Sequence, residues 1–562
     1  MVSKQYKWVS AGDVNAFFGL MLDNIADLLL TVGLLHAVFG FPVTFALGHM
    51  VPGTALGVLV GDLLFFALAI RVGRKLGKPD LTAMPLGLDT PSTFGMVFFV
   101  LGPAFLAARQ TMDVEQAAIY TWHIGICSIV ISGFFKLACA LISGWIRAAV
   151  PRAALLGSLA AIALVLISFL PILEVFHHPI VGLVSLSIIL TTLVARVPFP
   201  RLPLIGHLPG ALGAALVSGL MFYLLKWTGA DVLLGSTGDA PMIDPSTALF
   251  PTDWFTVFRF EWLARLGDSM QYMPVVIPFA LATVVGGIDC TESAASAGDE
   301  FDTKTVIGIE AIATLCAGLC GGVIQTTPYI GHPAYKAMGG RAGYVLATAL
   351  FVGGAGLFGY FGYLYAIIPK ATVFPILIFV GLEITAQTFR VTRRAHYPAI
   401  VLACVPALAA LVILYVDKLM GELAMVAYQT ADGQVANVSI ATLSATLQEE
   451  ISTVRILSSG FIVTSVLWAS ALVALIDRKL ARAGTIFAFG SVCVLFGLMH
   501  SPLPGGPVYL PWTLEPDAWE TVIRYAGGYG VVAVMLWVWS LGVSPLPSAS
   551  SDSHESSHHD EH

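Results

Sequence analysis

Long apolar stretches separated by short polar segments recur along most of the chain. The pattern predicts membrane spans near 25–42, 50–71, 89–108, 120–144, 153–171, 179–195, 208–227, 273–297, 306–322, 326–338, 341–361, 372–389, 396–416, 458–477, 484–500 and 526–543. A helix that crosses the hydrocarbon core needs about 20 mostly apolar residues. Only the stretch at 326–338 is too short for this. The sequence therefore predicts an all-α polytopic membrane protein.

Two of these stretches are interrupted by proline among glycines and small polar residues. Residues 81–96 read LTAMPLGLDTPSTFGM, and residues 321–340 read GGVIQTTPYIGHPAYKAMGG. Proline breaks helices, and non-helical backbone at membrane depth is tolerated only where it is buried in protein or lines a cavity. Interruptions at corresponding positions of two halves mark the binding site of many transporters built from inverted repeats. Two kinked helices without a ligand are the alternative.

Composition supports the membrane assignment and excludes several classes of function. Of the 562 residues, 57% are hydrophobic and 11% are charged, whereas soluble domains carry about 25% charge. The net charge of −7 indicates no nucleic-acid partner. The predicted spans contain neither HExxH nor Gly-x-Ser-x-Gly, and the one HExxH match, HESSH at 554–558, lies in the low-complexity tail, so we expect no enzyme activity and no cofactor. The seven cysteines show no Cys-x-x-Cys spacing, which predicts reduced packing residues and no metal site.

Ionisable residues inside the predicted spans are candidates for function, because a charge in lipid needs compensation. We considered His36, Asp62, Asp89, Lys136, Asp289, Glu292, Glu310, His332 and Glu383. Lys136, Glu310 and Glu383 are interpreted as structural. Asp289 and Glu292 share one helix face, and this predicts either a cation or solute site or a pair satisfied by neighbouring helices. The nearby residues 299–302, with three acids, are expected to form a solvated loop.

Five stretches resemble a known family. They are LLHAVFG (34–40), MPLGLDTPSTFGM (84–96), TESAASAGD (291–299), IEAIATLCAGLCGGVIQTTPYIG (309–331) with GGRAGY (339–344), and IPKATVFPILIFVGLEI (368–384). Together they resemble the nucleobase–cation symporter superfamily, which contains uracil and xanthine permeases, nucleobase–ascorbate transporters and adenine/guanine/hypoxanthine permeases. One departure is that the segment after Thr327 holds Gly331 and His332 in place of the acid usual in this family.

The resemblance implies a seven-plus-seven inverted repeat with a core domain and a gate domain. Spans 3 and 10 would each contain a short extended segment that leads into a half-helix. The substrate-binding residues carried over are Glu292, Asp89, Thr90, Ser92, Thr326, Thr327, Tyr329 and His36, and the cation-coupling residues are Asp289, Glu292 and His332. No metal site is implied.

Domain boundaries follow from these spans. We expect core spans 1–4 at 1–150, gate spans 5–7 at 151–228, a connector at 229–272, core spans 8–11 at 273–363, gate spans 12–14 at 364–480, two extra spans at 481–543 and a disordered tail at 544–562. Aromatic residues at helical spacing in DWFTVFRFEWLARL (253–266) predict an interfacial helix in the connector.

The sequence and the resemblance together predict an H⁺- or Na⁺-coupled symporter of a nucleobase or a similar small polar solute, working by alternating access. An anion transporter of the sulfate or bicarbonate type on the same scaffold, or a passive channel, are the alternatives. The loops on the N-terminal side hold most of the Lys and Arg residues, which places both termini in the cytoplasm. We expect a bacterial inner (plasma) membrane protein whose partners are lipid and a small molecule, and a homodimer is compatible with this.

Overall fold

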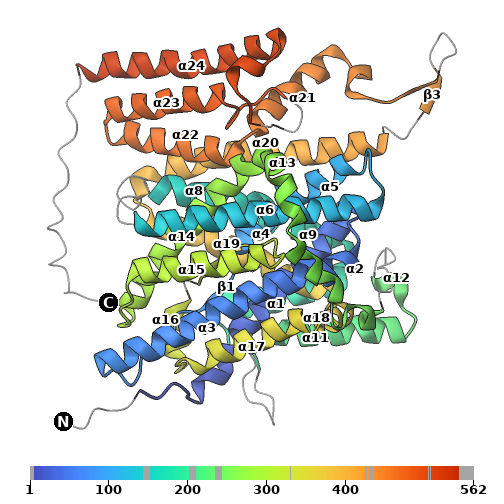
Figure 1. Ribbon diagram of the computed structural model, residues 1–562, viewed down its shortest axis with the longest axis vertical. Helices are drawn as coiled ribbons and strands as arrows, with labels where there is room; N and C mark the ends of the chain where they lie inside the picture. The colour runs from blue at the N-terminus through green and yellow to red at the C-terminus, as the bar shows by residue number, and fades with distance from the viewer. Residues whose placement is uncertain are drawn as a thin grey trace.

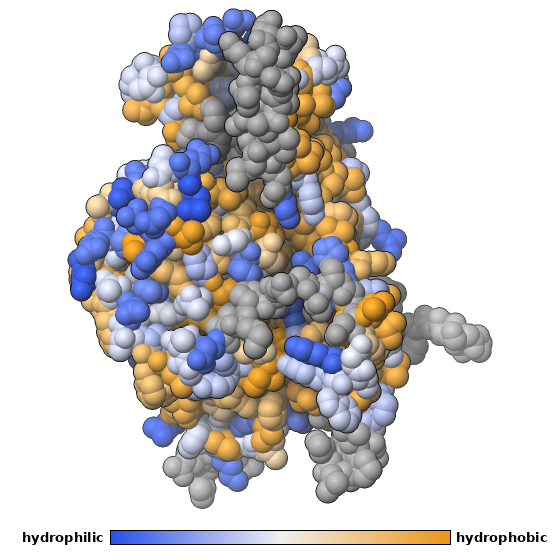
Figure 2. Space-filling model, turned by 90° about the vertical axis from the view of Figure 1, so that its right-hand side faces the viewer, coloured by the Kyte–Doolittle hydropathy of each residue, from blue (hydrophilic) through white to orange (hydrophobic). Residues whose placement is uncertain are grey.

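The protein is a bundle of roughly parallel helices (Figure 1). The computed structural model describes residues 6–142, 152–200, 210–234, 244–329, 331–423, 427–429, 435–503, 506 and 508–542. The histidine-containing tail predicted at 544–562 lies outside these residues. Figure 2 shows a face on which hydrophobic and hydrophilic residues are interspersed, with a group of hydrophilic residues at the upper left.

The first half of the chain contains seven spans, several of which are bent or broken. Spans 1–4 comprise α1 (Gly12–Phe39), α2 (Val43–Phe45) with η1 (Ala46–Met50) and α3 (Val51–Leu76), then β1 (Leu86–Leu88), α4 (Thr90–Met96), η2 (Val97–Leu101) and α5 (Gly102–Ala108), and α6 (Val114–Leu141). Spans 5–7 comprise α8 (Arg152–Ile162), η3 (Ala163–Ser168) and α9 (Phe169–His177), then α10 (Pro179–Ile189) with η4 (Leu190–Val194), and α11 (Gly210–Trp227).

The second half repeats this order. Spans 8–11 comprise α14 (Met273–Ser296), α15 (Thr303–Leu319), β2 (Thr326–Pro328) with α16 (His332–Ala337), and α17 (Gly343–Leu357) with α18 (Phe361–Ile367). Spans 12–14 comprise α19 (Lys370–Val391), η9 (Arg394–His396) with α20 (Tyr397–Leu423), and α22 (Phe461–Ile476). The two extra spans are α23 (Leu480–Leu495) and α24 (Pro516–Ser540).

The remaining elements belong to connections. They are α12 (Asp231–Leu234), η5 (Pro245–Ala248), η6 (Thr252–Arg259), η7 (Glu261–Arg265), α13 (Leu266–Ser269), η8 (Met270–Tyr272), β3 (Ala427–Gln429), β4 (Val435–Asn437), η10 (Ile440–Thr442), α21 (Ala445–Ser458) and η11 (Pro511–Thr513). In Figure 1, α12 and β3 lie on the side opposite to the end of α24.

These elements confirm the predicted all-α fold with inverted repeats. Within the described residues, ten helices are long and apolar enough to cross a membrane, and two bent helix pairs raise this to twelve. The two halves pack symmetrically. In one pair of equivalent contacts, α1 packs on α17 and α14 packs on α6. In the other, α3 packs on α17 and α15 packs on α6. The extended segments predicted in spans 3 and 10 are β1 and β2, which pair with each other.

The first span begins earlier than expected, at Gly12 and not near residue 25. Asp13 and Asn24 lie before the expected start and Asp27 lies just after it, and all three side chains are buried. Asp13 accepts hydrogen bonds from the backbone N–H groups of Arg341 and Tyr344 at the start of α17. Polar residues inside this helix therefore face protein, not lipid.

The connector forms no continuous interfacial helix. It consists of the short 3₁₀ helices η6 and η7, because Phe260 between them adopts a left-handed backbone conformation with φ of 56°. Trp254 and Trp262 are 7% and 3% exposed. Trp254 donates its indole N–H to the carbonyl oxygen of Cys320 at the end of α15. Trp254 and Trp262 thus pack on the bundle, whereas Phe255, Phe258 and Phe260 are exposed.

Polar contacts at both ends join the extra C-terminal helices to the spans that precede them. At one end, His396 lies 2.9 Å from Asp477, which follows α22. Burial alone would raise the pKa of Asp477. The pKa is nevertheless lowered below its ordinary value, because His396 contributes a hydrogen bond and a charge and Lys479 contributes a further charge. At the other end, the hydroxyl group of Tyr529 in α24 is 2.6 Å from the Trp468 indole nitrogen and 2.9 Å from the His500 ring.

Candidate functional site

Two extended segments from opposite halves of the chain pair at the centre of the bundle. β1 and β2 are antiparallel, with Leu86 opposite Pro328, Gly87 opposite Thr327 and Leu88 opposite Thr326. Gly87 is required here, because a Cβ atom at this position would come 2.5 Å from the Tyr329 hydroxyl oxygen. The pairing satisfies backbone groups that lie outside any helix, as the membrane interior demands.

Helix α1 lines one side of this strand pair with polar side chains. The side-chain oxygen of Asn24 accepts a hydrogen bond from the backbone N–H of Leu88 at 3.0 Å. The carboxylate of Asp27 accepts one from the Thr90 hydroxyl group at 3.1 Å. Asn24 and Asp27 are buried. This side therefore places a carboxylate directly at the start of α4.

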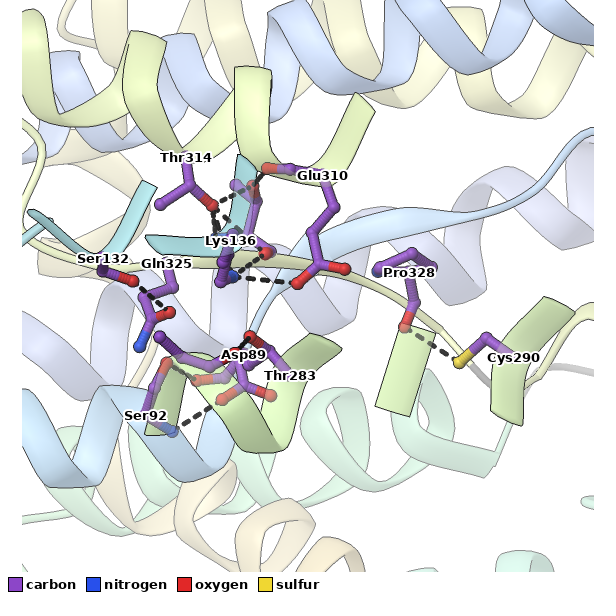
Figure 3. Close-up of polar contacts among 12 residues, drawn as sticks. Asp89, Ser92, Ser132, Lys136, Thr283, Cys290, Glu310, Thr314, Gln325 and Pro328 are labelled. Atoms are coloured by element: carbon purple, nitrogen blue, oxygen red, sulfur yellow. Dashed lines mark hydrogen bonds and ion pairs between the residues drawn. The ribbon is translucent and has the colours of Figure 1, made fainter. Parts of the chain in front are cut away.

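Helices α6 and α15 line the opposite side with a buried ion pair (Figure 3). The Lys136 ammonium group lies 2.9 Å from the Glu310 carboxylate, and neither side chain is exposed. Lys136 also donates a hydrogen bond to the carbonyl oxygen of Thr326 at 2.9 Å. The ion pair therefore holds β2 directly, and its two charges cancel.

The start of α4 is capped by Asp89, whose carboxylate accepts a hydrogen bond from the Ser92 N–H at 2.9 Å. The backbone N–H of Asp89 donates to the carbonyl oxygen of Gln325 at 3.1 Å, which extends the contact between the two broken spans. The Gln325 side chain accepts a hydrogen bond from Ser132 at 2.7 Å. Its amide nitrogen is buried and has no hydrogen-bond partner among the described residues.

Helix α14 presents two different faces. Its buried face carries Thr283, Gly287 and Cys290, and the Cys290 thiol donates to the carbonyl oxygen of Pro328 at 3.2 Å. The other face is half-buried and carries Asp289, Glu292 and Ser293. A Cβ atom at Gly286, next to this face, would meet no other atom within 4 Å. The Asp289 and Glu292 side chains are thus less buried than those of the first face, although the Oε1 atom of Glu292 is itself buried.

The structure brings together most of the residues predicted to bind substrate, whereas His36 of that set and the predicted cation-coupling residue His332 lie elsewhere. Asp89, Thr90, Ser92, Thr326, Thr327 and Tyr329 surround the strand pair, where the Tyr329 hydroxyl group donates to the Leu88 carbonyl oxygen at 3.1 Å. His36 contacts the carbonyl oxygen of Phe41 at the end of α1. This is nine residues, or about 14 Å, beyond Asp27 along the helix axis. His332 is buried against the carbonyl oxygen of Thr82 and against Asp299.

Sequence reasoning missed Asn24 and Asp27 and treated Lys136 and Glu310 as structural residues outside the site. The signal for the first two was present, because Asn24, Asp27 and Thr31 recur at helical spacing of three and four residues. Asn24 lies just before the expected start of the first span at residue 25, and Asp27 lies inside that span but was not counted among its ionisable residues.

The half-helix of span 10 is short, as the predicted stretch at 326–338 implied, and it is much shorter than that of span 3. α16 contains only six residues, His332–Ala337, whereas α4 continues through η2 and α5 to Ala108 without a break. A helix of six residues has too few aligned peptide groups for a strong dipole. Of the two half-helices, only α4 can therefore offer a substantial N-terminus to a solute.

Asp299 is not part of a solvated loop as expected, because its side chain is fully buried. It lies 2.6 Å from Lys336, 3.2 Å from Lys78 and 3.5 Å from His332. Its carboxylate also accepts a hydrogen bond from the Thr82 N–H at 3.1 Å. Asp299 thereby ties the segments that lead into β1 and out of β2 to the loop between α14 and α15.

Replacement of Asp299 by alanine should lower the free energy of unfolding by about 2 kcal/mol, because two lysines and a buried N–H lose their partner. Asp302 of the same loop only caps α15 by accepting from the Thr305 N–H at 2.9 Å. Its replacement by alanine should cost about 1 kcal/mol. Unfolding by SDS in mixed micelles measures both values, and an equal loss in both variants would contradict the difference in their roles.

Three solved structures are similar to this chain at low sequence identity. The transmembrane domain of the cyanobacterial bicarbonate transporter BicA is 16% identical, with a TM-score of 0.44 over 73% of this chain and 96% of that one. The murine Slc26a9 anion transporter in the inward-facing state is 12% identical, with a TM-score of 0.40 over 78% and 73%. A second SLC26A9 structure is 10% identical, with a TM-score of 0.40 over 94% and 90%.

No protein-family model matches the chain, and no curated protein matches it in sequence.

The predicted membership of the nucleobase–cation symporter superfamily is wrong. The three similar structures named above are of the bicarbonate transporter BicA and of the SLC26A9 anion transporter, and none of the three is a nucleobase permease. The motifs that suggested the superfamily lie largely in the broken spans and in α14.

Proposed function

We propose that the protein is a secondary transporter that moves a small anion together with H⁺ or Na⁺. Anions are the substrates named for BicA and Slc26a9. The support comes instead from the charges around the strand pair.

The main support for the proposal is that Asp27 and Asp89 have no ion pair with a basic side chain in the described part of the chain. Both carboxylates flank the first turn of α4, and neither forms an ion pair with a lysine or arginine among the described residues. Lys136, the buried cation on the far side of the strands, is neutralised by Glu310. Desolvated carboxylates without a counter-charge favour binding of a proton or a metal cation.

A cation bound here would change what the start of α4 attracts. With the carboxylates neutralised, the positive end of the helix dipole and the unpartnered amide of Gln325 favour a negatively charged solute. An anion would then bind only together with its cation, and this is the requirement for coupled transport. Acidic residues around an anion site are consistent with this scheme.

Uptake by the purified protein in proteoliposomes tests the proposal. Radiolabelled bicarbonate, chloride and sulfate are offered with an inward Na⁺ gradient, with an inward H⁺ gradient, and with neither. Accumulation above the external concentration that collapses with an ionophore supports coupled transport. Uptake that stops at equal concentrations and ignores ionophores would indicate a passive channel, and no uptake of any anion would reject the substrate class.

Replacement of Glu292 by glutamine should reduce this uptake tenfold or more, about the factor that 1.4 kcal/mol represents. The amide cannot accept a proton or balance a cation on the half-buried face of α14. Glu300, exposed in the loop that follows, provides the matched control, and its change to glutamine should leave uptake unchanged. Full uptake by the Glu292→Gln variant with normal folding would remove Glu292 from the site.

A further inference from the structure

A second place between the two predicted domains has the chemistry of an anion site. A small cavity separates α1 of the predicted core from the start of α19 of the predicted gate. Its lining includes Leu29, Leu30, Tyr365, Lys370, Phe374 and Leu377. Its volume is about 20 Å³, close to the space of one water molecule. The two domains are therefore nearly in contact here in this conformation.

Lys370 is a half-buried cation without a counter-charge. Its ammonium group has no hydrogen bond or ion pair within the described part of the chain, and its nearest recorded partner is the Tyr365 ring, with 5.7 Å from the nitrogen to the ring centroid. The carboxylate of Glu174 acts on Lys370 from a distance, but it contacts His177 at 3.6 Å. By contrast, Lys136 and Lys336 both lie within 3 Å of a carboxylate.

Tyr365 adds a second donor to the same cavity. Its hydroxyl group is buried and has no hydrogen-bond partner among the described residues. A buried hydroxyl group normally finds a partner, because water is no longer available to it. The cavity thus contains an ammonium group and a hydroxyl group that lack an acceptor, and its other residues named above are apolar.

The position of Lys370 at the start of a helix also favours a bound anion. It is the first residue of α19, a helix of 22 residues that has no side-chain cap at its N-terminus. The positive end of the helix dipole and the ammonium group therefore act in the same direction. Lys370 also faces the predicted core, since its Cε atom lies 3.9 Å from the place of a Cβ atom on Gly33 of α1.

We propose that Lys370 and Tyr365 form a binding position for a small, singly charged anion between α1 and α19. The inference rests on the proposed function and adds the charge of the substrate. One ammonium group balances one negative charge, and an apolar lining disfavours a second, uncompensated one. Bicarbonate, chloride and short carboxylates fit this description, whereas sulfate does not. The anion occupies the position when α1 and α19 separate and leaves it when they close.

Kinetics of bicarbonate uptake in proteoliposomes test this site. Replacement of Lys370 by glutamine should raise KM for external bicarbonate about tenfold and leave the maximal rate within about twofold, because the charge acts on binding. Lys370→Arg keeps the charge and should keep KM near that of the wild type. Lys418→Gln removes an exposed charge at the end of α20 and should change neither constant. An unchanged KM in Lys370→Gln would overturn the site.

Two further measurements test the site if the first variant does not fold, and test the charge of the anion. If Lys370→Gln does not fold, Tyr365→Phe decides by the same measurement, since loss of the hydroxyl donor should raise KM and an unchanged KM would overturn the site. Competition against labelled bicarbonate tests the charge class: unlabelled chloride should inhibit uptake, and equal inhibition by sulfate would overturn the assignment to singly charged anions.

The melting temperatures of the wild type and the variants, measured with and without an anion, distinguish failure of this inference from failure of the proposed function. Bicarbonate should stabilise the wild type and Lys370→Arg but not Lys370→Gln. Wild-type uptake with normal KM in Lys370→Gln rejects only the site. A wild type that neither takes up nor is stabilised by any of the three anions rejects the proposed function and the site with it.

Discussion

Replacement of Lys136 by methionine should lower the free energy of unfolding by about 3–5 kcal/mol, the range for removal of one partner of a buried ion pair. The Glu310 carboxylate would remain fully buried without its counter-charge. The Thr326 carbonyl oxygen would also lose its 2.9 Å hydrogen bond. Unfolding by SDS in mixed micelles measures the loss.

A double variant distinguishes the ion pair from simple packing. Lys136→Met combined with Glu310→Gln removes both charges and should recover most of the lost stability, because an uncharged pair has no unbalanced charge. Arg455 and Asp417 form a surface ion pair at 2.6 Å, and Arg455→Met should cost less than 1 kcal/mol. Equal losses in Lys136→Met and Arg455→Met would show that the buried pair is not a structural support of β2.

Replacement of Gly53 by alanine should destabilise the protein by about 3 kcal/mol or more, since the added methyl group overpacks a backbone contact. A Cβ atom on Gly53 would come 2.2 Å from the Cys320 carbonyl oxygen and 2.3 Å from the Gly322 nitrogen. These atoms belong to the turn that leads from α15 into β2. Neither backbone can move without shifting the strand pair.

Gly308 provides the matched control for Gly53. It lies inside α15, where a Cβ atom would meet nothing within 4 Å. Alanine at this position should stabilise the helix by about 0.5–1 kcal/mol. The melting temperature in detergent reports both changes, and a similar effect of the two substitutions would contradict the close approach of α3 to the turn before β2.

Much of the fold was predictable because its signals are local. Apolar runs of sufficient length mark the spans, and Pro91 and Pro328 mark the two breaks. The pairing of β1 with β2 was not predictable, because it joins segments far apart in the chain and has no side-chain signature of its own. The break at Phe260 in the connector was missed for a similar reason, since nothing in the residue itself requires a left-handed conformation.

The site was predictable only where a charged residue stood inside an obvious span. Asp89 satisfied that condition and lies at the strand pair. Asp27 also lay inside the predicted span at 25–42, but it was not counted among the ionisable residues there and was missed. Asp299 shows the opposite error, since a cluster of acids after a glycine looked solvated, whereas three basic side chains from other segments bury it. Such contacts exist only after the halves have come together.

The strand pair also has a consequence for how the protein is made. β1 ends at Leu88 and β2 begins at Thr326, so about 240 residues must be synthesised between the two. At about 5–20 residues per second, the ribosome needs roughly 10–50 s for this stretch. During that time the extended segment of span 3 lacks its partner strand, although its backbone cannot face lipid unsatisfied. The nascent first half must therefore stay beside the insertion machinery, or shelter this segment with water and Asn24, until the second half arrives.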